Sequence, residues 1–97
     1  MPYIKPEDRI ASLDIYIHDM AALLRNMHDL DVRKGPCNYT VTRLVLQAMK
    51  PDSGWSYHSI SNAIAVLRDA ATEMERRLMG PREDKAITTN GDIPEYA

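Results

Sequence analysis

The stretch that decides the fold is Ile10-Ala-Ser-Leu-Asp-Ile-Tyr-Ile-His-Asp-Met-Ala-Ala-Leu-Leu-Arg-Asn-Met27. Its apolar residues recur at alternating intervals of three and four, a spacing typical of a helical face and of a coiled-coil seam. We expect a helix from about residue 6 to 29, with Pro6 in the first turn, where proline is well tolerated. The seam consists of Ile10, Leu13, Ile17, Met20, Leu24 and Met27, widened by Tyr16 and Leu23.

A helix of that length measures roughly 36 Å, so it needs a second long helix to cover its seam. The sequence predicts this partner from Ser56 or Trp55 to Gly80-Pro81, a glycine cap followed by a helix breaker. We expect the two long helices to pack antiparallel. The apolar stripe of the second one consists of Ile60, Ala63, Ile64, Leu67, Ala70, Ala71, Met74 and Leu78.

A shorter helix is predicted between the two long ones. Gly35-Pro36-Cys37 reads as the end of a loop, and Asn38 is then a good N-cap. The segment Lys50-Pro-Asp-Ser-Gly54 ends this helix. Its predicted core stripe consists of Val41, Leu44, Val45 and Ala48, and its opposite face carries Tyr39, Arg43 and Leu46, with Thr42 beside them.

No stretch alternates with period two for long enough to predict a strand, so the fold class is all-α in a single domain, residues 1–97. The tail, residues 81–97, is too poor in apolar residues to build its own core. Ile87, Ile93 and Tyr96 indicate that it docks on the body or on a neighbouring subunit. A chain this short buries a limited share of its surface, so we expect a homodimer or homotetramer.

The tail is expected to form one or two helical turns over residues 81–89, then a turn at Asn90-Gly91-Asp92, then an extended end. The formal charge of −2 argues against a DNA or RNA polymer as partner, because that needs a basic face. The single cysteine, Cys37, excludes an internal disulfide and favours a reducing compartment. No apolar run is long enough for a membrane span, and no secretory signal opens the chain, which predicts a cytoplasmic protein.

The spacing of the histidines predicts no metal site, and no nucleophile elbow or phosphate-binding glycine loop occurs in the sequence. We therefore expect a protein that is not an enzyme and has no cofactor. The best ligand candidate runs from Asn38 to Arg43, because a helix N-terminus, a guanidinium and an aromatic face suit a phosphate joined to a base. The predicted binding residues are Asn38, Tyr39, Thr42 and Arg43, with the tail cations Arg82 and Lys85.

Tyr3, with Trp55 and Tyr57, either completes an aromatic box around the ligand or anchors a terminus and a loop to the core. The alternative for Tyr39 and Arg43 is simple packing against a neighbouring subunit or against the tail.

Several motifs together resemble a family of short proteins of unassigned function from bacteriophages, prophages and metagenomes. They span nearly the whole chain: the start Met1-Pro-Tyr-Ile-Lys-Pro-Glu-Asp-Arg9, Leu13-Asp14, Asn38-Tyr39, Thr42-Arg43-Leu44, Ser56-Tyr57, Ala63-Ile-Ala-Val-Leu67, Glu75-Arg76-Arg77, Glu83-Asp84-Lys85 and Asn90-Gly91-Asp92-Ile93. In the resemblance, Arg82 stands where an aromatic residue is expected.

Small helical phage proteins of this kind include anti-defence sponges, which sequester cyclic-oligonucleotide immune signals between subunits without cleaving them. The resemblance therefore implies a non-catalytic accessory protein that binds a small anionic ligand in the host bacterial cytoplasm. The alternative is a structural or interaction protein of a phage that acts through protein-protein contacts and has no small-molecule ligand.

Overall fold

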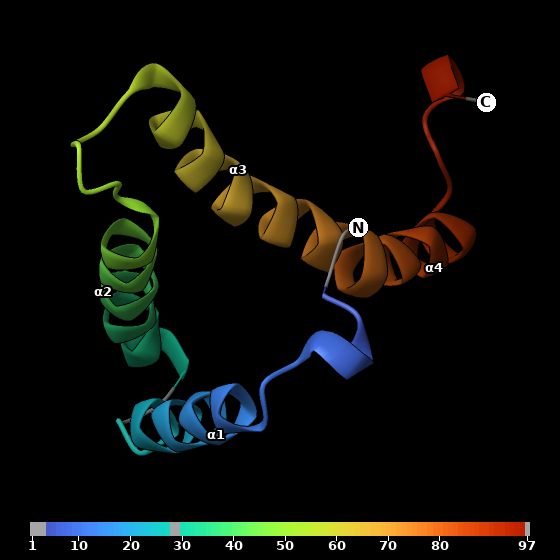
Figure 1. Ribbon diagram of the computed structural model, residues 1–97. Coiled ribbons are helices and arrows are strands. Elements are labelled where there is room, and N and C mark those ends of the chain that lie inside the picture. Colours follow the sequence, from blue (N-terminus) through green and yellow to red (C-terminus); the bar gives the residue numbers. More distant parts are fainter. Residues whose placement is uncertain (1–3, 28–29, 97) are drawn as a thin grey trace. The chain divides into compact units, whose positions relative to one another are not determined.

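The computed structural model describes residues 4–27 and 30–96 of the chain. These residues form helices and no strand, which confirms the all-α class (Figure 1). The chain divides after Trp55 into two compact units. Each unit is described by itself below.

The first unit begins with a short turn and then a helix that starts later than predicted. Pro6–Asp8 form the 3-10 turn η1, and α1 spans Ala11–Arg25. Between them Arg9 and Ile10 are extended, with ψ of 123° and 125°. The expected start at Pro6 was wrong, because the 3-10 turn closes on itself through the bond from Arg9 N–H to the Pro6 carbonyl, 3.2 Å.

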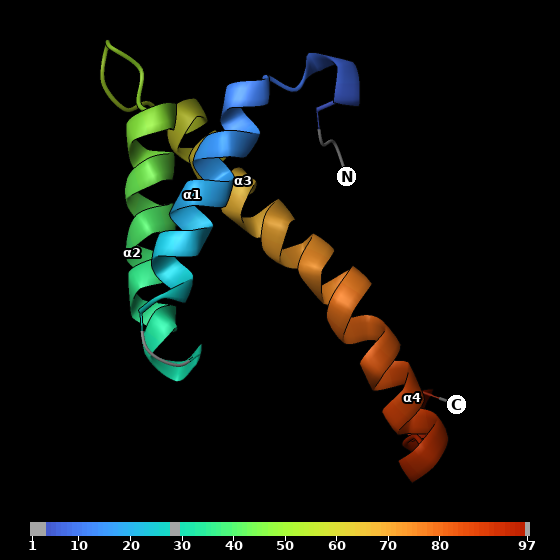
Figure 2. The ribbon, with the colours of Figure 1, turned by 90° about the horizontal axis from the view of Figure 1, so that it is seen from below.

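The next helix, α2, spans Leu30–Met49 and is longer than α1, so the predicted short middle helix was wrong. Gly35-Pro36 do not interrupt it. A proline inside a helix removes one backbone hydrogen bond and costs about 3 kcal/mol. Pro36 is half-buried, and α2 contacts α1. The two helices run in opposite directions side by side (Figure 2).

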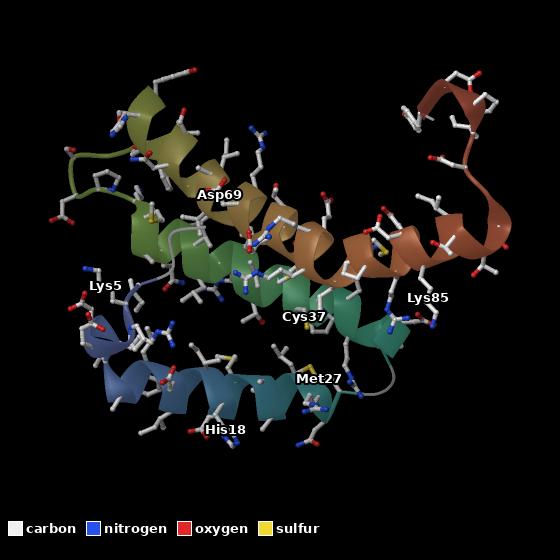
Figure 3. All side chains as sticks on the ribbon, turned by 90° about the vertical axis from the view of Figure 1, so that its right-hand side faces the viewer. Lys5, His18, Met27, Cys37, Asp69 and Lys85 are labelled. Carbon is white, nitrogen blue, oxygen red and sulfur yellow. The ribbon has the colours of Figure 1, made fainter. Side chains whose placement is uncertain are left out.

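The space between α1 and α2 holds the small core of the first unit. Figure 3 shows Met27 and Cys37 in this space, whereas His18 points away from it. The half-buried residues of α2 are Arg33, Pro36, Cys37, Thr40, Val45 and Met49. The predicted core stripe was therefore wrong in part: Leu44 is 65% exposed and Val41 45% exposed. The N-terminal half of α2 packs against α1 instead, and it was not expected to be helical.

The second unit opens with α3, Tyr57–Met74, and its start was predicted correctly. Ser56 is the N-cap and forms a capping box with Ser59. The Ser59 backbone N–H donates to Ser56 Oγ at 3.1 Å, and the Ser56 backbone N–H donates to Ser59 Oγ at 2.8 Å. These bonds satisfy backbone donors that a helix start leaves without partners, and they fix where the helix begins.

The helical path does not stop at Gly80, as the glycine–proline pair predicted. It passes through a single π turn, η2 at Glu75–Met79, into α4 at Gly80–Asn90 (Figure 2). Gly80 has φ of −52°, an ordinary helical value, and its N–H bonds to the Glu75 carbonyl. Pro81 is tolerated because it lies in the first turn of α4, where a missing N–H is harmless.

The end of α4 agrees with the turn predicted at Asn90-Gly91-Asp92. Gly91 has φ of 87° and its N–H bonds to the Ile87 carbonyl at 2.7 Å, which makes Gly91 the cap. The last regular element is a 3-10 turn, η3 at Pro94–Tyr96, in place of the extended end expected. Docking of the tail, association into oligomers and the pairing of the first and third helices stay predictions.

The second unit buries few side chains. Among its residues Ala63, Ser59 and Glu73 are less than 9% exposed. The predicted stripe stays largely exposed, with Ile60 at 45% and Met74 at 62%. No helix in the described part of the chain is both long and apolar enough to cross a membrane.

Candidate functional site

The predicted ligand residues Asn38, Tyr39, Thr42 and Arg43 all lie in the middle of α2. Because α2 begins at Leu30, Asn38 is not an N-cap, and that prediction was wrong. Backbone N–H groups in a helix interior bond to carbonyls four residues earlier and are not available to a ligand. Any binding at this place therefore depends on side chains.

Two of these side chains form a pair on the surface of α2. Arg43 Nη1 donates to Tyr39 Oη at 3.0 Å, and the guanidinium carbon lies 5.5 Å from the centre of the Tyr39 ring. The separation of four residues places both on one helical face. Tyr39 is 63% exposed, so the ring is stacked on one side by a cation and remains open to solvent.

Thr42 and Asn38 form a second pair beside the first. The Thr42 hydroxyl donates to Asn38 Oδ1 at 3.0 Å, and both residues are exposed. The bond occupies the Asn38 carbonyl oxygen and leaves its amide N–H₂ donors directed at solvent. The structure therefore brings all four predicted α2 residues together as two adjacent pairs, each joining residues one turn apart.

The charge of α2 differs from that of the whole protein. Between Asp31 and Asp52 the sequence contains Arg33, Lys34, Arg43 and Lys50 and no carboxylate. The chain as a whole has a net charge of −2. Within the described residues, no ion pair joins Arg43 or Lys50 to an acid. In this part of the chain, no carboxylate forms an ion pair that would neutralise their positive charge.

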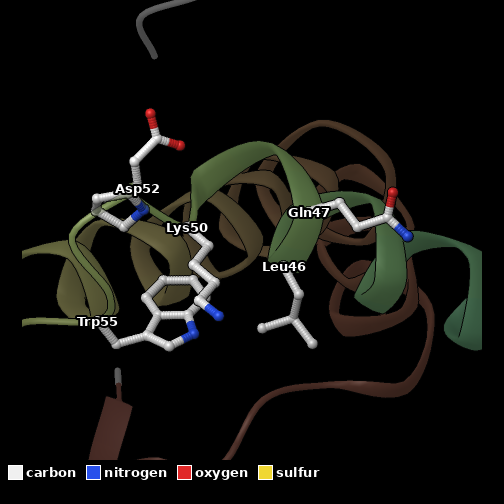
Figure 4. A pocket seen from close by; sticks show the side chains of 6 residues that line it. Leu46, Gln47, Lys50, Asp52 and Trp55 are labelled. Carbon is white, nitrogen blue, oxygen red and sulfur yellow. The ribbon is translucent and has the colours of Figure 1, made fainter.

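An open hollow lies beyond this pair, where α2 ends. Its volume is about 680 Å³, and it is lined by Leu46, Gln47, Lys50, Pro51, Asp52 and Trp55 (Figure 4). In Figure 4 the Lys50 side chain and the Trp55 indole lie on the same side of the hollow. The Asp52 carboxylate is directed away from them.

Sequence reasoning did not include Lys50 or Gln47 among the site residues. The signal was present, because Gln47 is four residues after Arg43 and Lys50 is seven residues after it, a helical repeat. This repeat was overlooked because the predicted site was confined to residues 38–43, at the expected N-terminus of the helix.

The remaining predicted residues lie outside α2. Arg82 and Lys85 lie on α4, in the second unit, so their participation stays a prediction. Arg82 borders a smaller hollow of about 270 Å³ with Met74, Glu75, Leu78 and Met79. Tyr3 lies outside the residues that the structure describes.

Two other arginines of the second unit are neutralised within the protein. Arg76 and Arg77 both donate to Oε1 of Glu73, each at 2.5 Å. These two hydrogen bonds lower the pKa of the Glu73 carboxyl from 4.5 to about 2. Glu73 is 7% exposed, and its carboxylate accepts hydrogen bonds from arginines three and four residues later. This cluster therefore has a structural role and needs no ligand to account for it.

The fold and this surface define a small all-helical protein with a basic, aromatic face on one helix. The chain belongs to the family described as Domain of unknown function (DUF6899), whose model matches residues 1–93. Neither the search of curated proteins nor the search of solved structures found a match.

Proposed function

We propose that this protein is a non-catalytic binding protein that sequesters a small anionic ligand on the exposed face of α2. The most specific form of the proposal is a cyclic-oligonucleotide immune signal, which makes the protein an anti-defence sponge of phage type. The observation that carries the proposal is the Tyr39–Arg43 pair, in which a cation that has no carboxylate partner among the described residues lies against an exposed aromatic ring.

The chemistry of the pair suits a phosphate attached to a base. A guanidinium has five N–H donors in a planar fork that matches two phosphate oxygens. Hydrogen bonds in the described residues engage Arg43 only through Tyr39 Oη. The open side of the Tyr39 ring offers a surface on which a base stacks, a contact worth about 1–3 kcal/mol. The exposed Asn38 amide adds a donor for a base edge or a ribose.

A thermal-shift screen followed by calorimetry tests the proposal. We expect one or more cyclic dinucleotides or trinucleotides to raise the Tm, and Arg43→Ala to abolish the rise. Lys34→Ala is the matched control, because it removes one positive charge from the same helix on the face opposite Tyr39. The ligand should be recovered intact by chromatography after incubation.

Failure of a broad nucleotide panel to shift the protein contradicts the proposal. A shift that Arg43→Ala and Lys34→Ala reduce equally also contradicts it, because the attraction is then nonspecific. Conversion of the nucleotide to a product removes the claim that the protein is non-catalytic.

A second candidate function is interaction with another copy of the chain, without a small-molecule ligand. It is favoured by the exposed stripe of α3, where Ile60, Ile64 and Leu67 are 45%, 47% and 39% exposed. Their spacing, with Met74 and Leu78, follows the alternation of a coiled-coil seam. Light scattering tests this candidate: we expect a dimer or tetramer, and a stable compact monomer contradicts it.

A further inference from the structure

The hollow at the end of α2 has fixed walls. Its floor is the helix itself, and one wall is the turn that follows, where the Gly54 N–H donates to the Pro51 carbonyl at 3.0 Å. Gly54 has φ of 93°, a conformation that other residues rarely adopt, so the turn depends on this glycine. The turn carries Trp55 to the hollow next to Lys50.

The side chains of the hollow repeat the chemistry of the Tyr39–Arg43 pair. Trp55 is 36% exposed, so part of the indole face is open to solvent. Lys50 supplies a cation with three donors, and the Gln47 amide supplies both a donor and an acceptor. Leu46, 49% exposed, adds apolar surface. Trp55, Lys50 and Gln47 thus provide an aromatic face, a cation and an amide, the same three groups that Tyr39, Arg43 and Asn38 provide.

The hollow and the pair lie on the same face of α2. From Tyr39 to Leu46 is seven residues, so the two side chains differ by only about 20° around the helix. Arg43 precedes Gln47 by one turn, and Gln47 lines the hollow. Lys50 directly follows Met49, the last residue of α2, and seven residues separate it from Arg43, about 10 Å at the rise of a helix. Gln47 lies between the two cations in the sequence.

We infer that Tyr39, Arg43, Gln47, Lys50 and Trp55 form one continuous binding surface for a nucleotide ligand with at least two phosphates and two bases. One base stacks on Tyr39 and the other on Trp55, while Arg43 and Lys50 each contact a phosphate. This inference rests on the proposed function, which it extends from one nucleotide unit to two. Alternating aromatic faces and cations are the usual means by which proteins hold single-stranded nucleotides.

The sequence provides a direct probe, because Trp55 is the only tryptophan of the chain. Tryptophan-selective excitation therefore reports on the hollow alone. We expect cyclic dinucleotides or trinucleotides to quench this emission with the same Kd that calorimetry gives. The matching mononucleotide should bind more weakly, and inorganic pyrophosphate, which has no base, should not quench.

Two variants with a matched rescue separate the parts of the surface. Lys50→Ala should weaken the calorimetric Kd by about tenfold, as expected for loss of one charge-assisted contact. Lys50→Arg, which keeps the charge, should restore most of the affinity. Arg43→Ala should weaken the Kd and also the quenching at Trp55, because one ligand occupies both ends. Far-UV circular dichroism checks that each variant keeps its helices.

The outcomes separate this inference from the proposed function. Binding that depends on Arg43 but neither quenches Trp55 nor depends on Lys50 overturns the inference and leaves the proposed function standing. Quenching that depends on Lys50 but not on Arg43 overturns both, because the hollow then acts alone. Equal affinity for the mononucleotide and the cyclic dinucleotide overturns the inference, since only one unit is then bound.

Discussion

Two pairs of cations in this protein have opposite surroundings. Arg76 and Arg77 share the carboxylate of Glu73, which lies three and four residues before them. Arg43 lies on α2 and Lys50 directly follows it, in a stretch with no carboxylate between Asp31 and Asp52. The first pair is satisfied by its own helix, whereas the second pair has charge available for another molecule.

The difference comes from a single position. Gln47 lies four residues after Arg43 and three before Lys50, a spacing at which side chains on one helical face are neighbours. A neutral amide there leaves both charges uncompensated, and a carboxylate would form an internal ion-pair cluster. A surface suited to anions therefore differs from an ordinary solvated helix face in having cations that no carboxylate of the same helix neutralises. The number of cations alone does not distinguish the two.

The largest expected effect comes from reversing the charge at the centre of the α2 surface. Arg43→Glu removes a forked donor and adds repulsion against phosphate, so we expect nucleotide affinity to fall about 100-fold. The measurement is isothermal titration calorimetry with the cyclic nucleotide that gives the largest thermal shift.

Lys34→Glu serves as the control, because it makes the same change in net charge on the opposite face of α2. It should alter affinity several-fold less than Arg43→Glu. An equal loss of nucleotide affinity in both variants would mean that the two faces of α2 do not differ in binding. It would contradict the claim that Arg43 and Lys50, unlike Arg76 and Arg77, have charge available for a ligand.

Gln47→Glu tests the comparison without removing any cation. The new carboxylate should pair with Arg43 and Lys50 and lower nucleotide affinity about tenfold through competition for the same donors. Stability should rise slightly, by about 0.3–0.5 kcal/mol per pair on a helix surface. Calorimetry and thermal unfolding measure the two effects. Gln47→Leu, which adds no charge, should leave the affinity within a few-fold of the parent.

Helix type and position were predictable where local chemistry agrees with packing. The start of α3 followed from Ser56, because a serine cap satisfies backbone donors whatever the rest of the chain does. The sequence failed at Pro36 and Gly80, where breaker residues lie inside a continuing helical path. At Pro36 the helix continues despite the lost bond, and at Gly80 the helical path continues through a π turn. Neither continuation is encoded in the local pattern.

Only the pairing of Tyr39 with Arg43 on one helical face could be predicted from the sequence. Tyr39 and Arg43 were found from their spacing on one face, which needs only a helix. The helix N-terminus expected at Asn38 does not exist, because that expectation depended on where α2 begins. Lys50 and Gln47 were missed for the same reason, since the site extends toward the other end of the helix.

Arg76 and Arg77, the cations paired with Glu73, lie in the π turn directly before Gly80. Their pairing with Glu73 therefore depends on a helical path that continues around Gly80. Gly80 has a helical φ, and a Cβ there meets its nearest atom, the Glu75 carbonyl oxygen, at an ordinary 3.5 Å. Gly80→Ala should therefore stabilise the protein by about 0.5–1 kcal/mol. Gly91→Ala, at φ of 87°, should destabilise it by about 1 kcal/mol. Chemical denaturation measures both changes in the free energy of unfolding. Destabilisation by Gly80→Ala would contradict a continuous helical path and would support the helix end that the sequence predicted at Gly80.

The smallest expected effect is a pH dependence of the protein's stability. It arises from Glu73, the carboxyl that neutralises Arg76 and Arg77. The pKa of Glu73 is lowered from 4.5 to about 2 in the folded state by its hydrogen bonds to Arg76 and Arg77. Its contribution to stability is therefore complete above about pH 4.5 and is lost as the pH falls toward 2.

Glu73→Gln should lower the Tm at pH 7, and the Tm difference from the parent should shrink across this range of pH. Glu75→Gln, a neighbouring carboxyl without a recorded ion pair in the structure, should leave the parent's pH profile unchanged in the same window. Because no ion pair joins Arg43 or Lys50 to a carboxylate within the described residues, neutralising variants there should not alter this acid limb. A Glu73→Gln profile parallel to that of the parent would show that the carboxylate does not hold its arginines in solution, and the contrast between the two cation pairs would then disappear.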